Sequence, residues 1–336
     1  MPMLRNRFLR LTIAAFGVSM PVLAAAAQNA AQPAAPAAAQ PAALAPNQAT
    51  SPTPDQPFSL RIQANEVNLV FSVTDKRGHF VTGLKQEDFG LLDDGRPPER
   101  VLRFVQQTNL PLRIGIMLDT SSSVHSRFQF EQDSASEFLL QTLHQNDRAF
   151  VEGFDVQIDL EQDYTNKIDL LSSGIHKLRP GGGTALFDSL YKTCRDQMLT
   201  LAQDIAVRKV IILITDGEDN YSRVLEHEAI QECQRASTNI YTISTNISAT
   251  TTKGDDYLRD IAEATGGVAF FPEKLEEIAV NFKNIQEELR SQYQLVYRPA
   301  NFKQDGSFRT IYLQPIRGNN FVARVKKGYF APHPVQ

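Results

Sequence analysis

The stretch that decides the fold is Leu112-Arg113-Ile114-Gly115-Ile116-Met117-Leu118, followed at once by Asp119-Thr120-Ser121-Ser122-Ser123. The same pattern, an apolar run followed by polar residues, recurs where Val210 to Ile214 (VIILI) precedes Thr215-Asp216-Gly217. Continuous apolar runs of this length are typical of strands that are buried on both faces, as the central strands of a parallel sheet are. Each run therefore predicts a central strand with polar side chains at its carboxyl end.

Segments with helical periodicity lie between these strands. The expected helices are 128–143, 167–178, 186–201, 224–236, 256–264 and 274–289, and further strands are expected at 149–154, 157–160, 240–245 and 268–271. Regular alternation of strand and helix is typical of a doubly wound, mostly parallel sheet with helices on both faces. We therefore predict an α/β domain over residues 109–292.

The segments on either side of this domain have a different pattern. Residues 58–108 and 293–336 consist of short alternating apolar stretches separated by turn signals such as Asp93-Asp94-Gly95 and Asp305-Gly306. Aspartate and glycine favour turns, through local side-chain hydrogen bonds and tolerance of positive φ. We expect the two segments to meet as one small β-sandwich, with the α/β domain inserted between them.

Polar side chains from three separate segments are expected to converge at the carboxyl edge of the parallel sheet. Ligands of open α/β sheets bind at that edge, where the strand order reverses. The residues concerned are Asp119, Ser121, Ser123 and Asp216, together with Thr184, which follows three glycines and precedes a helix. Carboxylates and hydroxyls without His or Cys suit a hard cation such as Mg²⁺. A site with few charged ligands leaves the ion electrophilic, and an open coordination position favours a carboxylate from a partner.

The pattern Asp119-x-Ser121-x-Ser123, Thr184 and Asp216 resembles the metal-ion-dependent adhesion site of von Willebrand factor type A (vWA) domains. The resemblance implies a Rossmann-like fold, and it implies that Ser121, Ser123 and Thr184 contact the ion while Asp119 and Asp216 act through water. It also implies an adhesion-type function, in which a divalent cation (Mg²⁺, with Mn²⁺ or Ca²⁺ as alternatives) bridges to an Asp or Glu of a protein partner.

The longer chain resembles the bacterial exported group called VWFA-related domain proteins. That resemblance rests on Val73-Thr74-Asp75-Lys76-Arg77-Gly78, Glu87-Asp88-Phe89, Gln292-Tyr293 and Lys327-Gly328-Tyr329-Phe330, among other short segments. It implies the architecture more than the biochemical role.

Two other functions stay open at this point. The first is a structural subunit of the cell envelope that makes its contacts through the β-rich flanks. The second is a metal-assisted hydrolase, which is disfavoured because no general base is tied to the motif by spacing. We therefore expect a binding protein and no enzymatic activity.

The N-terminal residues predict export. Arg5, Arg7 and Arg10 precede an apolar stretch that ends in small residues near Ala27, as in a secretory signal peptide. An uncleaved membrane anchor is the alternative, but the stretch is shorter than about 20 residues and contains Pro21. Residues 28–57 contain 11 Ala and 7 Pro and predict a disordered linker.

The signal-like N-terminus of the 336-residue chain predicts a periplasmic or extracellular location, and the composition bears on the partner. Lys and Arg total 34 and Asp and Glu total 38, so the formal charge is −4, which argues against nucleic acid as a partner. After removal of residues 1–27 we expect no membrane insertion. The partner's identity and the oligomeric state do not follow from the sequence.

Three further features have an ordinary structural interpretation. Cys194 and Cys233 lie on apolar stripes of two helices that right-handed crossovers place on the same face of the sheet, so a disulfide is geometrically possible. We expect two buried free thiols instead, because core cysteine is common. His125 and His176 are expected to be surface or core residues, and the helix at 274–289 is expected to pack statically.

Overall fold

The computed structural model describes residues 65–106, 110–201, 207–247, 250–316 and 321–333. The predicted signal peptide at 1–27 and the predicted linker at 28–57 lie outside these residues. Within them, no helix is long and apolar enough to cross a membrane.

The α/β part is built on a six-stranded sheet with strand order β6-β5-β4-β7-β8-β9. The strands are β4 (Leu112–Asp119), β5 (Arg148–Phe154), β6 (Ile158–Thr165), β7 (Arg208–Thr215), β8 (Thr238–Ser244) and β9 (Ala269–Phe270). Every pairing is parallel except that of β6 with β5. The two apolar runs that decide the fold are thus neighbouring central strands, because β4 pairs with β7 along its length.

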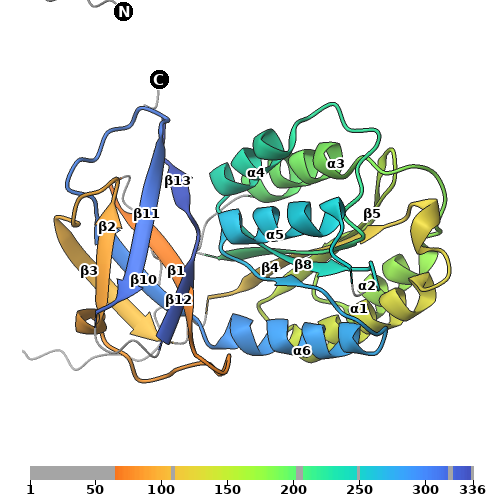
Figure 1. The fold of residues 1–336 in the computed structure, drawn as a ribbon, viewed down its shortest axis with the longest axis horizontal. Coiled ribbons are helices and arrows are strands. Elements are labelled where there is room, and N and C mark those ends of the chain that lie inside the picture. The colour runs from red at the N-terminus through yellow and green to blue at the C-terminus, as the bar shows by residue number, and fades with distance from the viewer. Residues whose placement is uncertain (1–64, 107–109, 202–206, 248–249, 317–320, 334–336) are drawn as a thin grey trace, which may run out of the picture. The chain divides into compact units, whose positions relative to one another are not determined.

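Helices cover both faces of this sheet (Figure 1). On one face lie α1 (Phe128–Thr142), α2 (Ile168–Lys177) and α6 (Glu277–Arg290). On the other lie α3 (Leu186–Thr193), α4 (Glu226–Arg235) and α5 (Lys253–Thr265). Alternate residues of the central strands supply the two cores, since Ile212 and Ile214 face the first layer and Ile211 and Leu213 face the second. The predicted doubly wound α/β class is confirmed.

The flanking segments form two antiparallel sheets. The first has the order β12-β1-β10-β3 and the second β13-β11-β2. Their strands are β1 (Val67–Asp75), β2 (Phe89–Asp93), β3 (Arg100–Gln106), β10 (Tyr293–Arg298), β11 (Phe308–Pro315), β12 (Phe321–Val325) and β13 (Gly328–Phe330). Side chains of both sheets share one apolar core, in which Phe71 stacks on Tyr293 and meets Phe89 edge to face. Three short helices complete the described elements: η1 (Gln86–Asp88), η2 (Ser122–Val124) and η3 (Cys194–Leu199).

Some element boundaries differ from the expectations for local reasons. The helix expected at 256–264 begins at Lys253, because Thr252 accepts a hydrogen bond from the Asp255 N–H and the Asp255 carboxylate accepts one from the Thr252 N–H. It ends at Thr265 and is capped by Gly266, whose φ of 84° suits a residue without a side chain. The helix expected at 186–201 changes from α to π geometry at Cys194.

The expectation of two free thiols is wrong. Cys194 and Cys233 are joined by a disulfide, with their Cα atoms 4.9 Å apart. Both side chains are fully buried in the core between α3 and α4. Apolar stripes show which face of a helix is buried, but the separation of two facing residues depends on how closely the helices pack, which the stripes do not reveal.

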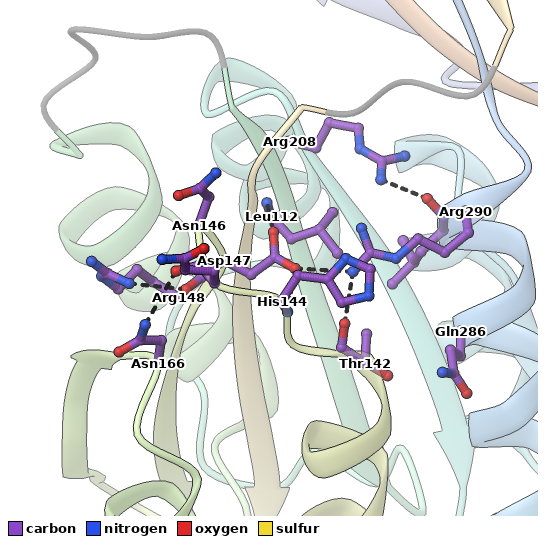
Figure 2. A network of polar contacts seen from close by, with 12 residues as sticks. Leu112, Thr142, His144, Asn146, Asp147, Arg148, Asn166, Arg208, Gln286 and Arg290 are labelled. Atoms are coloured by element: carbon purple, nitrogen blue, oxygen red, sulfur yellow. Dashed lines mark hydrogen bonds and ion pairs between the residues drawn. The ribbon is translucent and has the colours of Figure 1, made fainter.

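A polar network at the amino-terminal edge of the six-stranded sheet ties α6 to the strands (Figure 2). Asp147 accepts hydrogen bonds from the Leu112 N–H at 2.7 Å and from the His144 N–H at 2.9 Å. The guanidinium of Arg290 donates to the same carboxylate at 2.9 Å and to the carbonyl of Thr142 at 2.7 Å. These bonds give partners to backbone groups at the start of β4 and around the end of α1, and they attach the end of α6 to both.

Candidate metal site

The two aspartates singled out in the sequence lie at the carboxyl ends of adjacent strands. Asp119 is the last residue of β4, and Asp216 follows β7 directly. Because β4 and β7 are parallel neighbours in register, their ends meet at one edge of the sheet. From β4 the chain continues to α1 through a connection, here called the serine loop, which carries Ser121 and contains η2 with Ser123.

Hydrogen bonds connect four of the five expected site residues. The Asp119 carboxylate accepts from the Ser121 N–H at 2.7 Å and from the Thr215 hydroxyl at 2.5 Å. The hydroxyls of Ser121 and Ser123 are 2.9 Å apart, and Ser123 donates to the Asp216 carboxylate at 2.7 Å. Carboxylate and hydroxyl oxygens from two strand ends are therefore gathered into one continuous cluster.

The loop that carries Thr184 is attached to the serine loop through the backbone. The N–H and the hydroxyl of Ser122 both lie 3.1 Å from the carbonyl oxygen of Gly182. The N–H of Gly181 donates to the Thr120 carbonyl at 2.6 Å. These contacts join the two loops at Gly181 and Gly182, two and three residues before Thr184, but among the hydrogen bonds of the described residues none joins the Thr184 side chain to the other four.

Thr184 itself is held by residues that the sequence pattern did not single out. Its N–H donates to the Asn220 side chain at 3.1 Å, and its carbonyl accepts from the N–H groups of Asn220 and Tyr221. The ring of Tyr221 covers Gly183 so closely that a side chain at that position would meet it at 2.1 Å. A side chain at 183 would therefore have to displace the exposed ring of Tyr221, and nothing local in the sequence marks Asn220 or Tyr221 as neighbours of this loop.

The electrostatics of the cluster are those of an uncompensated negative site. Asp119 is fully buried, and burial raises the pKa of its carboxyl to about 6, although hydrogen bonds from Thr215 and Ser121 oppose the increase. The negative charge of Asp216 raises it further. None of the ion pairs within the described ranges includes either aspartate.

These donors fit a hard divalent cation. Carboxylate and hydroxyl oxygens are the ligands that Mg²⁺, Mn²⁺ and Ca²⁺ accept, and a buried carboxylate without a counter-charge is stabilised by a cation. The described part of the chain contains no group of three or more His, Cys, Asp or Glu that would hold a metal ion. A metal site in that part therefore depends on hydroxyl ligands as well as carboxylates.

Among the hydrogen bonds of the described residues, none joins the side chains of His176, Glu218 or Asp219 to the cluster, although the Glu218 N–H donates to the Asp216 carboxylate at 3.1 Å. His176 of α2 contacts Asp133 of α1 at 3.0 Å, and this hydrogen bond raises the pKa of the imidazole. Its side chain is 44% exposed. Glu218 is exposed, and Asp219 accepts a hydrogen bond from the Ser222 N–H within its own loop.

The family model of the von Willebrand factor type A domain matches residues 114–288, which is more than half of the chain. The protein therefore belongs to the vWA family. The match covers β4 to α6 and includes every candidate site residue.

Several solved structures resemble the chain. Proximal thread matrix protein 1 from the mussel byssus, in a structure described as having a zinc-occupied MIDAS motif, shares 20% identity over 60% of this chain and 50% of its own, with a TM-score of 0.47. BatB from Bacteroides thetaiotaomicron shares 16% over 54% of this chain and 100% of its own, with a TM-score of 0.44. The vWF domain of the type V pili tip protein Mfa5 from Porphyromonas gingivalis shares 15% over 54% of this chain and 95% of its own, also with a TM-score of 0.44. The chain thus spans about half of the mussel protein. No curated protein matches the chain.

Proposed function

We propose that this protein is an exported, metal-dependent protein-binding module and not an enzyme. The observation that carries the proposal is the hydrogen-bonded cluster of Asp119, Ser121, Ser123 and Asp216 at the carboxyl edge of the central strands. Membership of the vWA family supports the same conclusion. Export is inferred from the signal-like residues 1–27, and it implies a periplasmic or extracellular location.

The residues that would hold the ion are Ser121, Ser123 and Thr184, with Asp119 and Asp216 orienting them. When bound, a divalent cation such as Mg²⁺ supplies a positive, oxygen-seeking centre for an anionic ligand. Ser123 is exposed, whereas Ser121 and Asp119 are buried, so the cluster extends from the core to the surface. We propose that the ligand is an Asp or Glu carboxylate of a partner protein.

The first prediction concerns Asp119→Ala. We expect this variant to bind no Mg²⁺ in calorimetric titrations, because the carboxylate that organises Ser121 and Thr215 is lost. Wild-type protein should gain about 2.7 kcal/mol of stability at an Mg²⁺ concentration of 100 times Kd. The variant should gain none. Chelator should likewise release the partner captured from an envelope extract by the wild-type protein.

The matched control for this experiment is Asp133→Asn. Asp133 is a carboxylate of α1 with a side chain that is 61% exposed and paired with His176. We expect the control to bind Mg²⁺ and partner as the wild type does. Retained, chelator-resistant capture of the partner by Asp119→Ala would contradict the proposal.

A second candidate function is a structural envelope subunit that binds through its sandwich. It is favoured by exposed apolar side chains on β11, β12 and the segment after β11, where Tyr312, Val322 and Ile316 are 57%, 56% and 64% exposed. Replacing Tyr312 and Val322 by serine would abolish capture under this function. Under the metal-dependent function the same double variant would still capture the partner.

A further inference from the structure

Glu131, in the first turn of α1, is a buried carboxylate without hydrogen bonds. Its side chain is 0% exposed. Neither of its carboxylate oxygens has a hydrogen-bond partner among the described residues. Buried charges in proteins are normally paired and hydrogen-bonded, because an unpaired one is strongly disfavoured outside water. Glu131 therefore lacks the hydrogen bonds that a buried carboxylate normally has.

Arg127 compensates Glu131 only in part. The Nε atom of Arg127 lies 3.5 Å from a Glu131 oxygen, which is an ion pair but too long for a good hydrogen bond. That Nε atom is itself buried without a hydrogen-bond partner. Another nitrogen of the same guanidinium donates to the Thr245 hydroxyl at 3.2 Å instead. The guanidinium of Arg127 is thus divided between Glu131 and Thr245.

The remaining charged surroundings of Glu131 are negative. Burial raises the pKa of Glu131 to about 8, Arg127 opposes this increase, and the charges of Asp119 and Asp216 raise it further. Glu131 therefore interacts electrostatically with both aspartates of the candidate metal site. Contacts also lead from Glu131 to the cluster: its partner Arg127 donates to Thr245, the Thr245 N–H donates to the Thr215 carbonyl, and the Thr215 hydroxyl donates to Asp119.

We infer that Glu131 is a third carboxylate of the metal site, acting from the outer shell of the ion; this inference rests on the proposed function. Its unpartnered oxygens are acceptors for the water that a hard cation retains. A bound cation would favour the ionised form of Glu131, which burial alone disfavours. Glu131 is accordingly a positioning residue and not a direct ligand.

Glu131→Gln tests this role with little change of shape. Removal of an outer-shell group commonly weakens metal affinity by about 10-fold to 100-fold. We expect at least about 10-fold weaker Mg²⁺ binding in calorimetric titrations. A merely structural role would change stability and leave the affinity for Mg²⁺ as it was.

Glu152→Gln is the matched control. Glu152 of β5 is a buried carboxylate of the same domain, but its hydrogen-bond partner is Thr193 of α3, and Asp196 is the charged group that raises its pKa. We expect Mg²⁺ affinity within about twofold of wild type for this variant, against about 10-fold or more for an outer-shell change. If the amide at 131 prevents folding, Glu131→Leu removes the same charge without leaving a polar group, and it should show the same loss of affinity.

The outcomes separate this inference from the proposed function. If wild-type protein and Glu131→Gln bind Mg²⁺ equally while Asp119→Ala does not bind it, the metal site stands and the role of Glu131 is wrong. If wild-type protein does not bind Mg²⁺, Mn²⁺ or Ca²⁺, both proposals are wrong. Weaker binding by Glu131→Gln with unchanged binding by Glu152→Gln supports both.

Discussion

Glu152 shows how one buried side chain makes stability depend on pH. It points from β5 toward α3, is 2% exposed, and accepts a hydrogen bond from the Thr193 hydroxyl at 2.6 Å. Burial raises the pKa of its carboxyl from 4.5 to about 7, although the hydrogen bond opposes the increase. The folded protein therefore holds a proton here that the unfolded chain releases at lower pH.

We predict that the contribution of Glu152 to stability falls as pH rises from about 4.5 to about 7, because the folded state binds the proton more tightly than the unfolded state does. The change is up to about 3 kcal/mol. Urea unfolding of the wild type and of Glu152→Gln at pH 4.5 and pH 8 measures it. Relative to the wild type, the variant should be more stable at pH 8 than at pH 4.5. The same difference in free energy of unfolding at both pH values would contradict the raised pKa of Glu152.

At the scale of elements, the disulfide joins two helices on one face of the sheet. Cys194 begins the π-helical segment η3 that follows α3, and Cys233 lies in α4. The two cysteines are 39 residues apart in the sequence, and the intervening chain includes β7 and its loop with Asp216. Closing a loop of this length restricts the unfolded chain more than the folded one.

Replacing both cysteines by alanine should therefore lower the free energy of unfolding by about 2 to 4 kcal/mol while the fold is retained. Chemical denaturation with and without reductant measures the effect, and reductant should not affect the double variant. In addition, protein denatured without reductant should show no reactive thiol. Two reactive thiols in that assay would mean that the cysteines are free.

At the scale of the whole described structure, Glu288 of α6 connects the α/β domain to the two antiparallel sheets of the sandwich. Its carboxylate is 4% exposed and accepts hydrogen bonds from Ser72 of β1 at 2.9 Å and Tyr241 of β8 at 3.2 Å. Arg324 of β12 donates to it at 2.9 Å. Two strands of the sandwich and one strand of the central sheet thus share a single carboxylate.

We predict that Arg324→Ala destabilises the protein by about 1 to 2 kcal/mol, because a buried carboxylate loses its cationic partner while its two hydroxyl donors remain. Hydrogen exchange should increase in β12 and at the end of α6. Arg259→Ala is the control, since Arg259 pairs with Asp256 on the surface, where such pairs contribute little. Equal effects of the two substitutions would show that the junction is not coupled through Glu288.

The local pattern of apolar and polar residues was sufficient to predict most of the strands and helices. Buried parallel strands are apolar on both faces and surface helices are apolar on one, so strand and helix types follow from periodicity. The approach of Asp119, Ser121, Ser123 and Asp216 was also predictable, because neighbouring parallel strands end at the same edge of a sheet. That these residues hold a metal ion stays a prediction.

Other features depended on contacts between segments that are distant in the sequence. A glutamate in an amphipathic helix has the pattern of a solvated residue, so the burial of Glu131 and the junction role of Glu288 were not visible. The pairing of Asn220 with Thr184 has no local signal either.

The sequence by itself determined the kinds of elements, their order and the positions of the polar clusters, because hydrophobic period and turn chemistry act over a few residues. Only the tertiary structure decided which side chains meet: the disulfide, the partly compensated Glu131 and the carboxylate shared by the α/β domain and the sandwich. The physical reason is that helix rotation and packing distance are set by the fit of whole elements, and a shift of a few ångströms there makes or breaks a bond.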